Sequence, residues 1–493
     1  MFPKTIALLL CISFVFVFSL SAQEQLGIRL SNYGGINSTL LNPAYHTTSP
    51  FTWDVNLVEG ASSVWNNYTY FRDASLVSLL KDIKDIKVEF GPDLVEGVQP
   101  KPGGVVIDFF RDGRQREAYV LNSILGPSFY VQAGQHRLGL VTRARQLGSA
   151  HGVDTDYSYY DYDRRAFFDD FAVAPFRTAI AGWTEVGLNY AFTGETASGT
   201  FAVGVTLKAL QSYEGIYFTN RETFRYQKLP NDSIGSTSPA DFAFGFTTNN
   251  LDTKEYRPVR NGGGMAADLG VVFTIDGETD APYLWKFGFS LLDVGKLNFR
   301  KNAEAHTVQI PDAVSIATEA YRAFSGLEEG QDYIRFFSSQ TLGDSAASLS
   351  GSSFGIWLPS AFSFQADRAL GGNFFVGANY TQGFSLGEGA LQRGSLLAIS
   401  PRMESRWLEA AIPITVYDWQ QVRVGLALRL AFFTIGTEHL GSIFRKSDFQ
   451  GTDLYFAIKI NPFQLSQKDK GWQSGRQPRV SGGKKGRIRC YKF

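Results

Sequence analysis

The sequence predicts an all-β fold, a transmembrane antiparallel β-barrel, from three observations. Its 493 residues include 50 glycines, 22 tyrosines, 41 phenylalanines and 8 tryptophans, which favour strands and turns over helices. Many segments alternate apolar and polar residues. An export signal is followed by no apolar run of about 18 residues, and an exported chain without a spanning helix can still cross a membrane as a closed barrel.

Residues 1–22 are predicted to be a cleaved secretory signal peptide. Lys4 precedes a short apolar run and then small residues up to Ala22. Cys11 leaves with this peptide, so Cys490 is the single cysteine of the mature chain and no disulfide is expected. We expect export to the bacterial outer membrane.

Alternation is clearest in "QQVRVGLALRLAFFTIG", residues 420–436, where two arginines stand between valines, leucines and alanines. In a soluble sheet the polar face would meet water. In a barrel the apolar face contacts lipid, and an arginine turned toward lipid would cost about 2–4 kcal/mol at the midplane. The arginines must then face the lumen. The same alternation places six charged side chains there: Lys208, Asp268, Lys286, Arg423, Arg429 and Lys459.

The barrel is predicted to span residues 51–465 with about 14 to 16 strands, many of about 9 to 12 residues, which suits a tilted strand crossing a hydrocarbon layer. Strands of a soluble sandwich are commonly about 5 to 6 residues long. The candidate strands include 104–110 and 313–322. Aromatic residues near strand ends, among them Trp183 and Trp407, are expected in interfacial girdles.

Long polar connections are expected on the outer side of the membrane, because outer-membrane barrels keep short turns on the other side. These connections are 149–175, 227–258, 293–312 and 325–355. Residues 75–86 carry leucine and isoleucine at helical spacing, which predicts a short amphipathic helix. It would either pack on the barrel rim or meet a hydrophobic ligand.

Several stretches carry a resemblance to known families. "LLNPAY" (40–45) resembles the Asn-Pro-Ala element near the mature N-terminus of barrels of the long-chain fatty acid transporter (FadL) type. "GGGMAADLGVVF" and "LWKFGFSLLDVGKLNF" resemble two successive strands of that superfamily. "ILGPSFYVQAGQHRLGLVTRAR" and "WTEVGLNYAFTGETASGTFAVGVTLKAL" are more specifically similar to a family of unknown function among Bacteroidota outer-membrane proteins. Together these resemblances extend over most of residues 23–465.

The resemblance implies a FadL-like barrel whose N-terminal segment, residues 23–50, folds into the lumen as a hatch. Asn42, Pro43 and Ala44 are the hatch residues that it carries over. By the same resemblance, the barrel is expected to have about 14 strands.

No catalytic or metal chemistry is expected. The five histidines lack metal-ligand spacing, and no Gly-x-Ser-x-Gly elbow occurs. The acidic stretch "DTDYSYYDYD" (154–163) lacks the glycine-containing pattern of a calcium loop, so a solvated loop is favoured. With 47 basic and 47 acidic side chains, the chain shows no charge bias toward nucleic acid. We therefore expect neither an enzyme nor a bound cofactor.

The chain ends in a basic segment, residues 466–493, which is too rich in glycine, serine and glutamine to build a core and is expected to be disordered in the periplasm. It could dock on a protein partner through an acidic surface or an added strand, or lie on anionic lipid headgroups. The docking residues would be Lys484, Lys485, Arg487, Arg489, Cys490, Tyr491 and Phe493.

Two functions follow from this sequence. The first is passive transport of small hydrophobic molecules by a barrel that contacts outer-membrane lipid. The second is an accessory role in a larger outer-membrane machine for secretion or barrel assembly, with the basic tail as the docking segment.

Overall fold

The structure is a computed structural model that describes residues 24–462 except 82–86, 92–103, 156–164, 231–232, 237, 252–255, 278–280, 312, 318–320, 322–323 and 325–328. The predicted signal peptide, most of the acidic stretch 154–163 and the basic tail lie outside the described residues. Among the described residues, no helix is long and apolar enough to cross a membrane.

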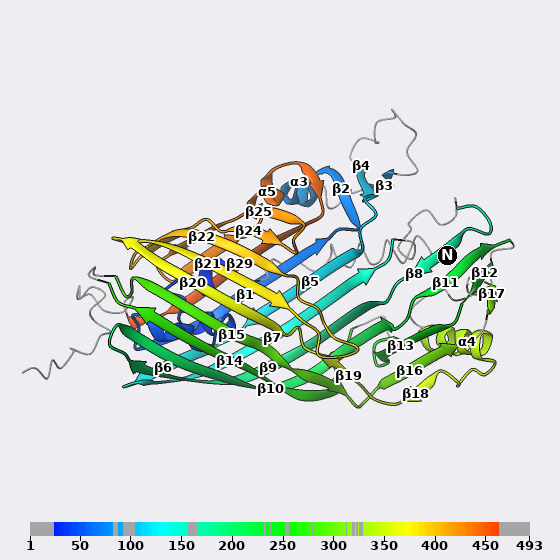
Figure 1. Ribbon diagram of the computed structural model, residues 1–493, viewed down its shortest axis with the longest axis horizontal. Coiled ribbons are helices and arrows are strands. Elements are labelled where there is room, and N and C mark those ends of the chain that lie inside the picture. Colours follow the sequence, from blue (N-terminus) through cyan, green and yellow to red (C-terminus); the bar gives the residue numbers. More distant parts are fainter. Residues whose placement is uncertain are drawn as a thin grey trace, which may run out of the picture.

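The predicted fold class is confirmed, because the main sheet closes into an antiparallel barrel of 14 strands (Figure 1). The closing pair is β1 (Trp53–Asn66) with β29 (Gly451–Ile460), from Val55 opposite Ile460 to Trp65 opposite Gly451. Closure pairs the strand edges that an open sheet would leave exposed. Between β1 and β29 the wall consists of β5 (Arg116–Leu125) with β6 (Ser128–Ala133), β7 (His136–Val153), β9 (Phe176–Glu195), β10 (Gly199–Asn220), β14 (Gly262–Ile275), β15 (Trp285–Phe299), β20 (Ala361–Gly371), β21 (Phe374–Gly383), β22 (Leu396–Glu404), β23 (Leu408–Ala411) with β24 (Ile414–Tyr417), β25 (Gln421–Val424) with β26 (Leu426–Leu430), and β27 (Phe433–Thr437).

The two ends of the barrel differ. Connections at one end are short, such as 134–135 and 372–373, whereas those at the other end are long, such as 67–115 and 300–360. We call these the short-turn end and the long-loop end. Several strands continue past the length needed to cross a membrane, with β9 and β10 reaching 20 and 22 residues.

The extended wall corrects the expectation that 227–258, 293–312 and 325–355 are loops, because each of them contains a strand of the main sheet. Residues 293–312, predicted to be a loop, form the end of β15 and the strand β16 (Ala303–Ile310). The basic pair Arg300 and Lys301 lies in the turn between these two strands. The wall at the long-loop end is completed by β13 (Ala240–Thr247), β18 (Leu349–Gly351) and β19 (Phe354–Trp357).

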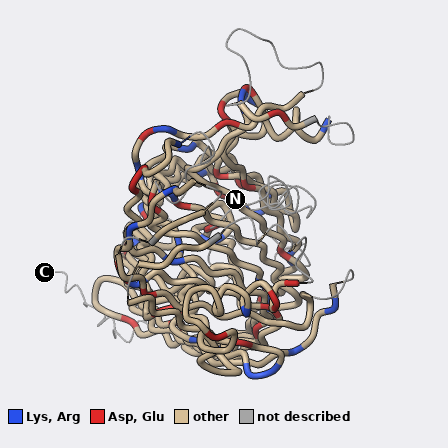
Figure 2. The backbone as a smooth tube through the Cα atoms, turned by 90° about the vertical axis from the view of Figure 1, so that its right-hand side faces the viewer, with Lys and Arg blue, Asp and Glu red and all other residues tan. Residues whose placement is uncertain are grey.

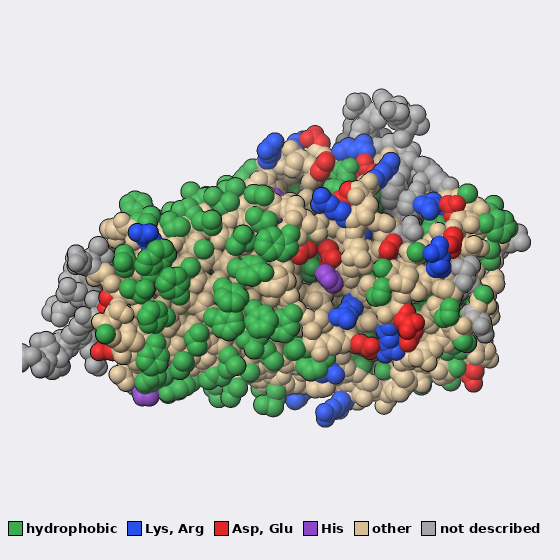
Figure 3. Space-filling view, viewed as in Figure 1, with side chains coloured by type: hydrophobic (Ala, Val, Ile, Leu, Met, Phe, Trp, Pro, Cys, Tyr) green, Lys and Arg blue, Asp and Glu red, His purple; other side chains and the backbone are tan. Residues whose placement is uncertain are grey.

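The outer face carries an apolar belt, visible as the green area over the left part of Figure 3, while charged side chains gather toward the long-loop end. The stretch 420–436 explains how the belt forms. Val422 and Leu430 are 69% and 67% exposed, whereas Arg423 and Arg429 are 7% and 8% exposed. The apolar residues therefore face lipid and the arginines face the lumen, as the alternation predicts.

Two expected barrel strands lie outside the barrel. Residues 104–110 form β4 (Gly104–Phe109), part of a small sheet that projects at the top of Figure 2. The described part of 313–322 forms β17 (Ser315–Ala317) of a second small sheet. Both segments alternate, but they are too short to cross a membrane. The small sheets are β28 (Ser447–Phe449), β2 (Thr69–Ala74), β4 and β3 (Lys87–Phe90), and β17, β12 (Ser233–Ser236), β11 (Phe224–Leu229) and β8 (Asp170–Val173).

Three short helices lie at the long-loop end. α3 (Leu76–Lys81) falls within the predicted helix 75–86, most of whose remainder is outside the described residues. It packs against α5 (Leu440–Phe444) at the rim. α4 (Gly330–Leu342) covers aromatic side chains of the extended wall, where Phe337 lies 6.2 Å from Phe242 between ring centroids.

The N-terminal segment, defined here as residues 24–50, lies inside the barrel. It forms α2 (Leu26–Arg29) and two 3₁₀ turns, η1 (Gly35–Leu40) and η2 (Tyr45–Thr48). Nearly all of its residues are buried. The lumen is therefore the part of the molecule in which a functional site must be sought.

Candidate functional site

The lumen is filled in layers, and the neighbouring strands β7 and β9 show their order. From the short-turn end, β9 carries Asn189, Glu185, Trp183 and Arg177 on its inner face. In the same direction β7 carries Arg137, Arg145, Leu147 and His151. Arg145 pairs in register with Trp183, and His151 with Arg177. In this order the residues belong to four layers: the N-terminal segment, a charged layer, an apolar layer, and a pocket at the long-loop end that is lined by His151 and Arg177.

The Asn-Pro-Ala element binds the inner wall through its asparagine. Asn42 donates from Nδ2 to the backbone oxygens of Val271 (3.1 Å) and Phe289 (3.2 Å) and to Gln365 Oε1 (3.0 Å). Its Oδ1 accepts the Ala44 N–H at 2.9 Å, which fixes a local turn. One side chain thus joins the segment to three strands, β14, β15 and β20.

Glycines make room for this contact. A Cβ on Gly270 would lie 2.1 Å from Asn42 Oδ1, and a Cβ on Gly204 would lie 2.6 Å from the backbone of Pro43 and Ala44. Gly204 and Gly270 face each other across β10 and β14. Side chains at these two positions would collide with the element, so the glycines form its seat. The Pro43 carbonyl accepts a further bond from Asn189 Nδ2 at 3.2 Å.

The predicted lumen residues Lys208 and Asp268 meet in the charged layer. Lys208 Nζ lies 2.7 Å from both Asp268 and Asp293, and Arg145 lies 3.0 Å from Asp293. Arg145 also lies 3.7 Å from Glu185. All of these side chains are buried, so their charges must be balanced within the layer.

Lys286 holds the N-terminal segment directly. Its Nζ lies 3.8 Å from the centre of the Tyr45 ring and donates to Asn32 Oδ1 at 3.1 Å. Asp367 balances its charge at 3.7 Å and also bonds Arg402. The attraction of a buried ammonium to an aromatic face and to a carboxylate is stronger than in water, because water is excluded.

Lys459 and Arg429 hold another part of the segment. Lys459 donates to the Tyr33 carbonyl at 3.0 Å and pairs with Asp54 at 3.2 Å. Arg429 lies over the Tyr33 ring at 4.5 Å and donates to Glu409 at 3.0 Å.

Arg423, the last of the predicted lumen residues, contacts side chains of the wall. It lies over the Tyr417 ring at 4.0 Å and donates to Gln421 at 2.8 Å. Of the six residues, Lys286, Lys459 and Arg429 therefore contact the N-terminal segment. The other three, Lys208, Asp268 and Arg423, contact side chains of the wall.

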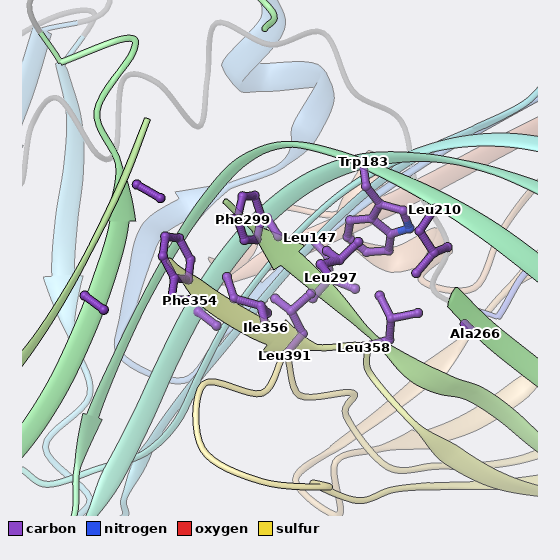
Figure 4. Close-up of a cluster of buried hydrophobic side chains, with 14 of the residues drawn as sticks. Leu147, Trp183, Leu210, Ala266, Leu297, Phe299, Phe354, Ile356, Leu358 and Leu391 are labelled. Carbon is purple, nitrogen blue, oxygen red and sulfur yellow. The ribbon is translucent and has the colours of Figure 1, made fainter. Parts of the chain in front are cut away.

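An apolar layer lies above the charges. We call it the mouth cluster, and it contains buried side chains of the wall and of two connections that fold inward, as Figure 4 shows. Its larger members are Leu121, Leu147, Trp183, Leu210, Leu297, Phe299, Phe354, Ile356, Leu358 and Leu391. Trp183, expected in an interfacial girdle, is instead 1% exposed and lies in this cluster, whereas Trp407 is 46% exposed on the outside.

The mouth loop, residues 384–395, forms one side of the cluster. Leu391 donates its N–H to the Trp357 carbonyl at 3.0 Å, and Trp357 donates to the Gly389 carbonyl at 3.2 Å. Deeper along the loop, Arg393 lies 3.5 Å from Asp293 and 3.7 Å from Glu24. The loop therefore connects the mouth to the first described residue of the N-terminal segment.

Several of these partners were not predicted, among them Arg145, Glu185, Asp293, Asp367, Arg393 and Arg402. Arg145 had a signal, since the alternation in "VTRARQ" places Arg143 and Arg145 on one face. Asp293 did not, because it lay in a predicted loop. Among the described residues, no three His, Cys, Asp or Glu side chains gather as a metal site.

The closed wall and its apolar belt define the class of protein: this is a membrane-spanning β-barrel with a filled lumen. The chain belongs to the family of unknown function DUF5723, whose model matches residues 43–438.

Comparison with solved structures finds distant barrels. The toluene transporter TbuX of Ralstonia pickettii is 11% identical, with a TM-score of 0.37, and the match covers 86% of this chain and 92% of that one. A deletion mutant (deltaS2S3) of the monoaromatic hydrocarbon channel TodX is 9% identical, with a TM-score of 0.38, over 87% and 94% of the two chains. No curated protein matches the sequence.

Proposed function

We propose that the protein passes small hydrophobic molecules across the outer membrane, with the mouth cluster as the site that first takes them up. The observation that supports this is the mouth cluster itself, a buried apolar layer on the long-loop side of the charged layer. An apolar molecule loses contact with water on entering such a layer, at a gain of about 25 cal/mol per Å² buried. The charged layer below offers no comparable gain.

Entry requires the mouth loop to move. Leu391 and Leu358 are 0% and 1% exposed, so a molecule can reach the cluster only by displacing side chains that close it. The loop also meets Glu24 through Arg393, at 3.7 Å, so only a displacement large enough to break this contact would reach the N-terminal segment. In this proposal the segment is the second closure, and it must yield before a molecule leaves the lumen.

Uptake of a hydrophobic dye, N-phenyl-1-naphthylamine, tests the proposal in a strain lacking the protein. The Leu391→Asp variant places a charge in the cluster, so it should slow uptake to the rate of the strain without the protein. Leu349→Asp is the matched control, because Leu349 is 51% exposed at the long-loop end and should leave uptake unchanged. Equal uptake with and without the wild-type protein would reject transport of this class.

A second candidate is the accessory role through the basic tail. The observation that favours it is the position of Ile460, which pairs with Val55 at the short-turn end, where the chain leaves the barrel toward residues 466–493. Truncation after Ser466 should then remove specific co-purifying proteins from a barrel that still inserts. If no partner is lost and dye uptake persists, this second function is wrong.

A further inference from the structure

A pocket lies above the mouth cluster, between the barrel wall and the mouth loop. Its volume is about 380 Å³. Three of its residues form one row across neighbouring strands, because His151 of β7 pairs with Arg177 of β9 and Arg177 pairs with Thr219 of β10. Glu388 of the mouth loop lies on the other side. The wall therefore presents three polar side chains at one level.

The wall side of this pocket has polar groups that the protein leaves without partners. Arg177 donates to Ser385 Oγ at 3.0 Å, and among the described residues no acidic side chain pairs with it. Thr219 is 3% exposed, and its Oγ1 has no hydrogen-bond partner. The Oδ1 of Asn220, which is 1% exposed, also has none. Buried polar atoms are normally hydrogen-bonded, so these point to a ligand or ordered water.

The other charged groups around the pocket have partners of opposite charge or hydrogen-bonding partners. Arg221 lies 2.8 Å from Glu388 and 3.0 Å from Asp241, and the bond to Glu388 holds the pKa of this guanidinium above its usual range. His151 Nδ1 lies 2.6 Å from Glu117 Oε2. Arg177 is therefore the arginine of the pocket that has no carboxylate partner among the described residues.

We propose that this pocket binds the carboxylate of a small hydrophilic molecule that also carries hydroxyl groups, such as a sugar acid. The guanidinium of Arg177 matches a carboxylate in charge and planar geometry. Thr219 Oγ1, on the same face of the wall as Arg177, can donate to the same group or accept from a hydroxyl. This site is separate from the proposed transport of hydrophobic molecules, since its ligand is polar and contacts the wall above the apolar layer.

Titration of the purified protein in mild detergent with D-gluconate tests the proposal, using saturation-transfer NMR. The neutral analogue D-sorbitol, which has a hydroxymethyl group in place of the carboxylate, is the matched probe. Gluconate should bind saturably and sorbitol at least about tenfold more weakly, because a charge-assisted bond is lost. Arg177→Gln should weaken gluconate binding about tenfold and Thr219→Val about threefold.

Arg225→Gln is the control, because Arg225 pairs with Asp170 in a small sheet outside the barrel wall and should not affect binding. Heat-modifiable migration confirms that each variant is folded, and if Arg177→Gln is not, Arg177→Lys and Thr219→Val decide. The site is rejected if wild-type protein does not bind gluconate, if sorbitol binds equally well, or if both pocket variants bind as the control does. Since no membrane passage is measured, these results are independent of dye uptake.

Discussion

The two halves of the lumen are closed by different kinds of contact. Toward the short-turn end, the N-terminal segment packs apolar side chains against the wall and is also held by directional contacts, such as those of Asn42 Nδ2 with three acceptors and the seat formed by Gly204 and Gly270. Toward the long-loop end, the mouth cluster is held chiefly by apolar contact. Directional contacts specify one position and leave costly unpaired groups when broken, whereas apolar contact tolerates rearrangement. We infer that the N-terminal segment is a fixed closure on the short-turn side, the lower closure, and that the mouth cluster is an adaptable closure on the long-loop side, the upper closure.

The largest effect should come from removing the lower closure. Deletion of residues 24–50 leaves the lumen charges Lys286, Lys459 and Arg429 facing an empty space that water can fill. We expect single-channel conductance in a planar bilayer to rise from a closed level to that of an open pore. Heat-modifiable migration shows that the barrel has formed. A correctly inserted deletion variant with unchanged conductance would mean that the segment does not close the lumen.

The next effect concerns the charged layer between the two closures. Lys208→Met leaves Asp268 and Asp293 without their shared ammonium, and breaking a buried pair in this way costs about 3–5 kcal/mol of unfolding free energy. Urea unfolding in detergent measures the loss. Lys446→Met, at an exposed residue, should change stability by no more than about 0.5 kcal/mol. Equal stability of both variants would show that the layer contributes little.

A smaller effect tests the glycine seat. Gly270→Ala should push the Asn-Pro-Ala element off the wall, because the new Cβ would lie 2.1 Å from Asn42 Oδ1. We expect a loss of about 1–3 kcal/mol and faster proteolysis within residues 24–50. Gly182→Ala is the matched control, since a Cβ there meets nothing within 4 Å. If both variants are cleaved at the wild-type rate, the seat does not hold the segment.

The sequence allowed the faces of the wall to be predicted but not the contents of the lumen. Alternation alone places Arg423 and Arg429 inward, because the cost of an arginine in lipid leaves one orientation. It could not find the Lys208–Asp293 pair, whose members are 85 residues apart, since which strands adjoin is a property of closure. Nor could alternation tell the wall from the small sheets that contain β4 and β17, because a short alternating segment fits either.

The smallest effect should come from the Arg221–Glu388 pair at the long-loop end. Its removal tests whether the two closures move separately. Glu388→Gln removes the charge that Arg221 binds at 2.8 Å, but an exposed pair of this kind contributes only about 0–1 kcal/mol. Amide exchange of the mouth loop, including Leu391, should therefore rise no more than about fivefold. High salt should reproduce the rise in wild-type protein and add little in the variant, since salt screens exposed charges. Arg225→Gln is the control. If exchange within residues 24–50 rises as much as in the mouth loop, the Arg393–Glu24 contact at 3.7 Å makes the two closures one unit, and the separation argued above is wrong.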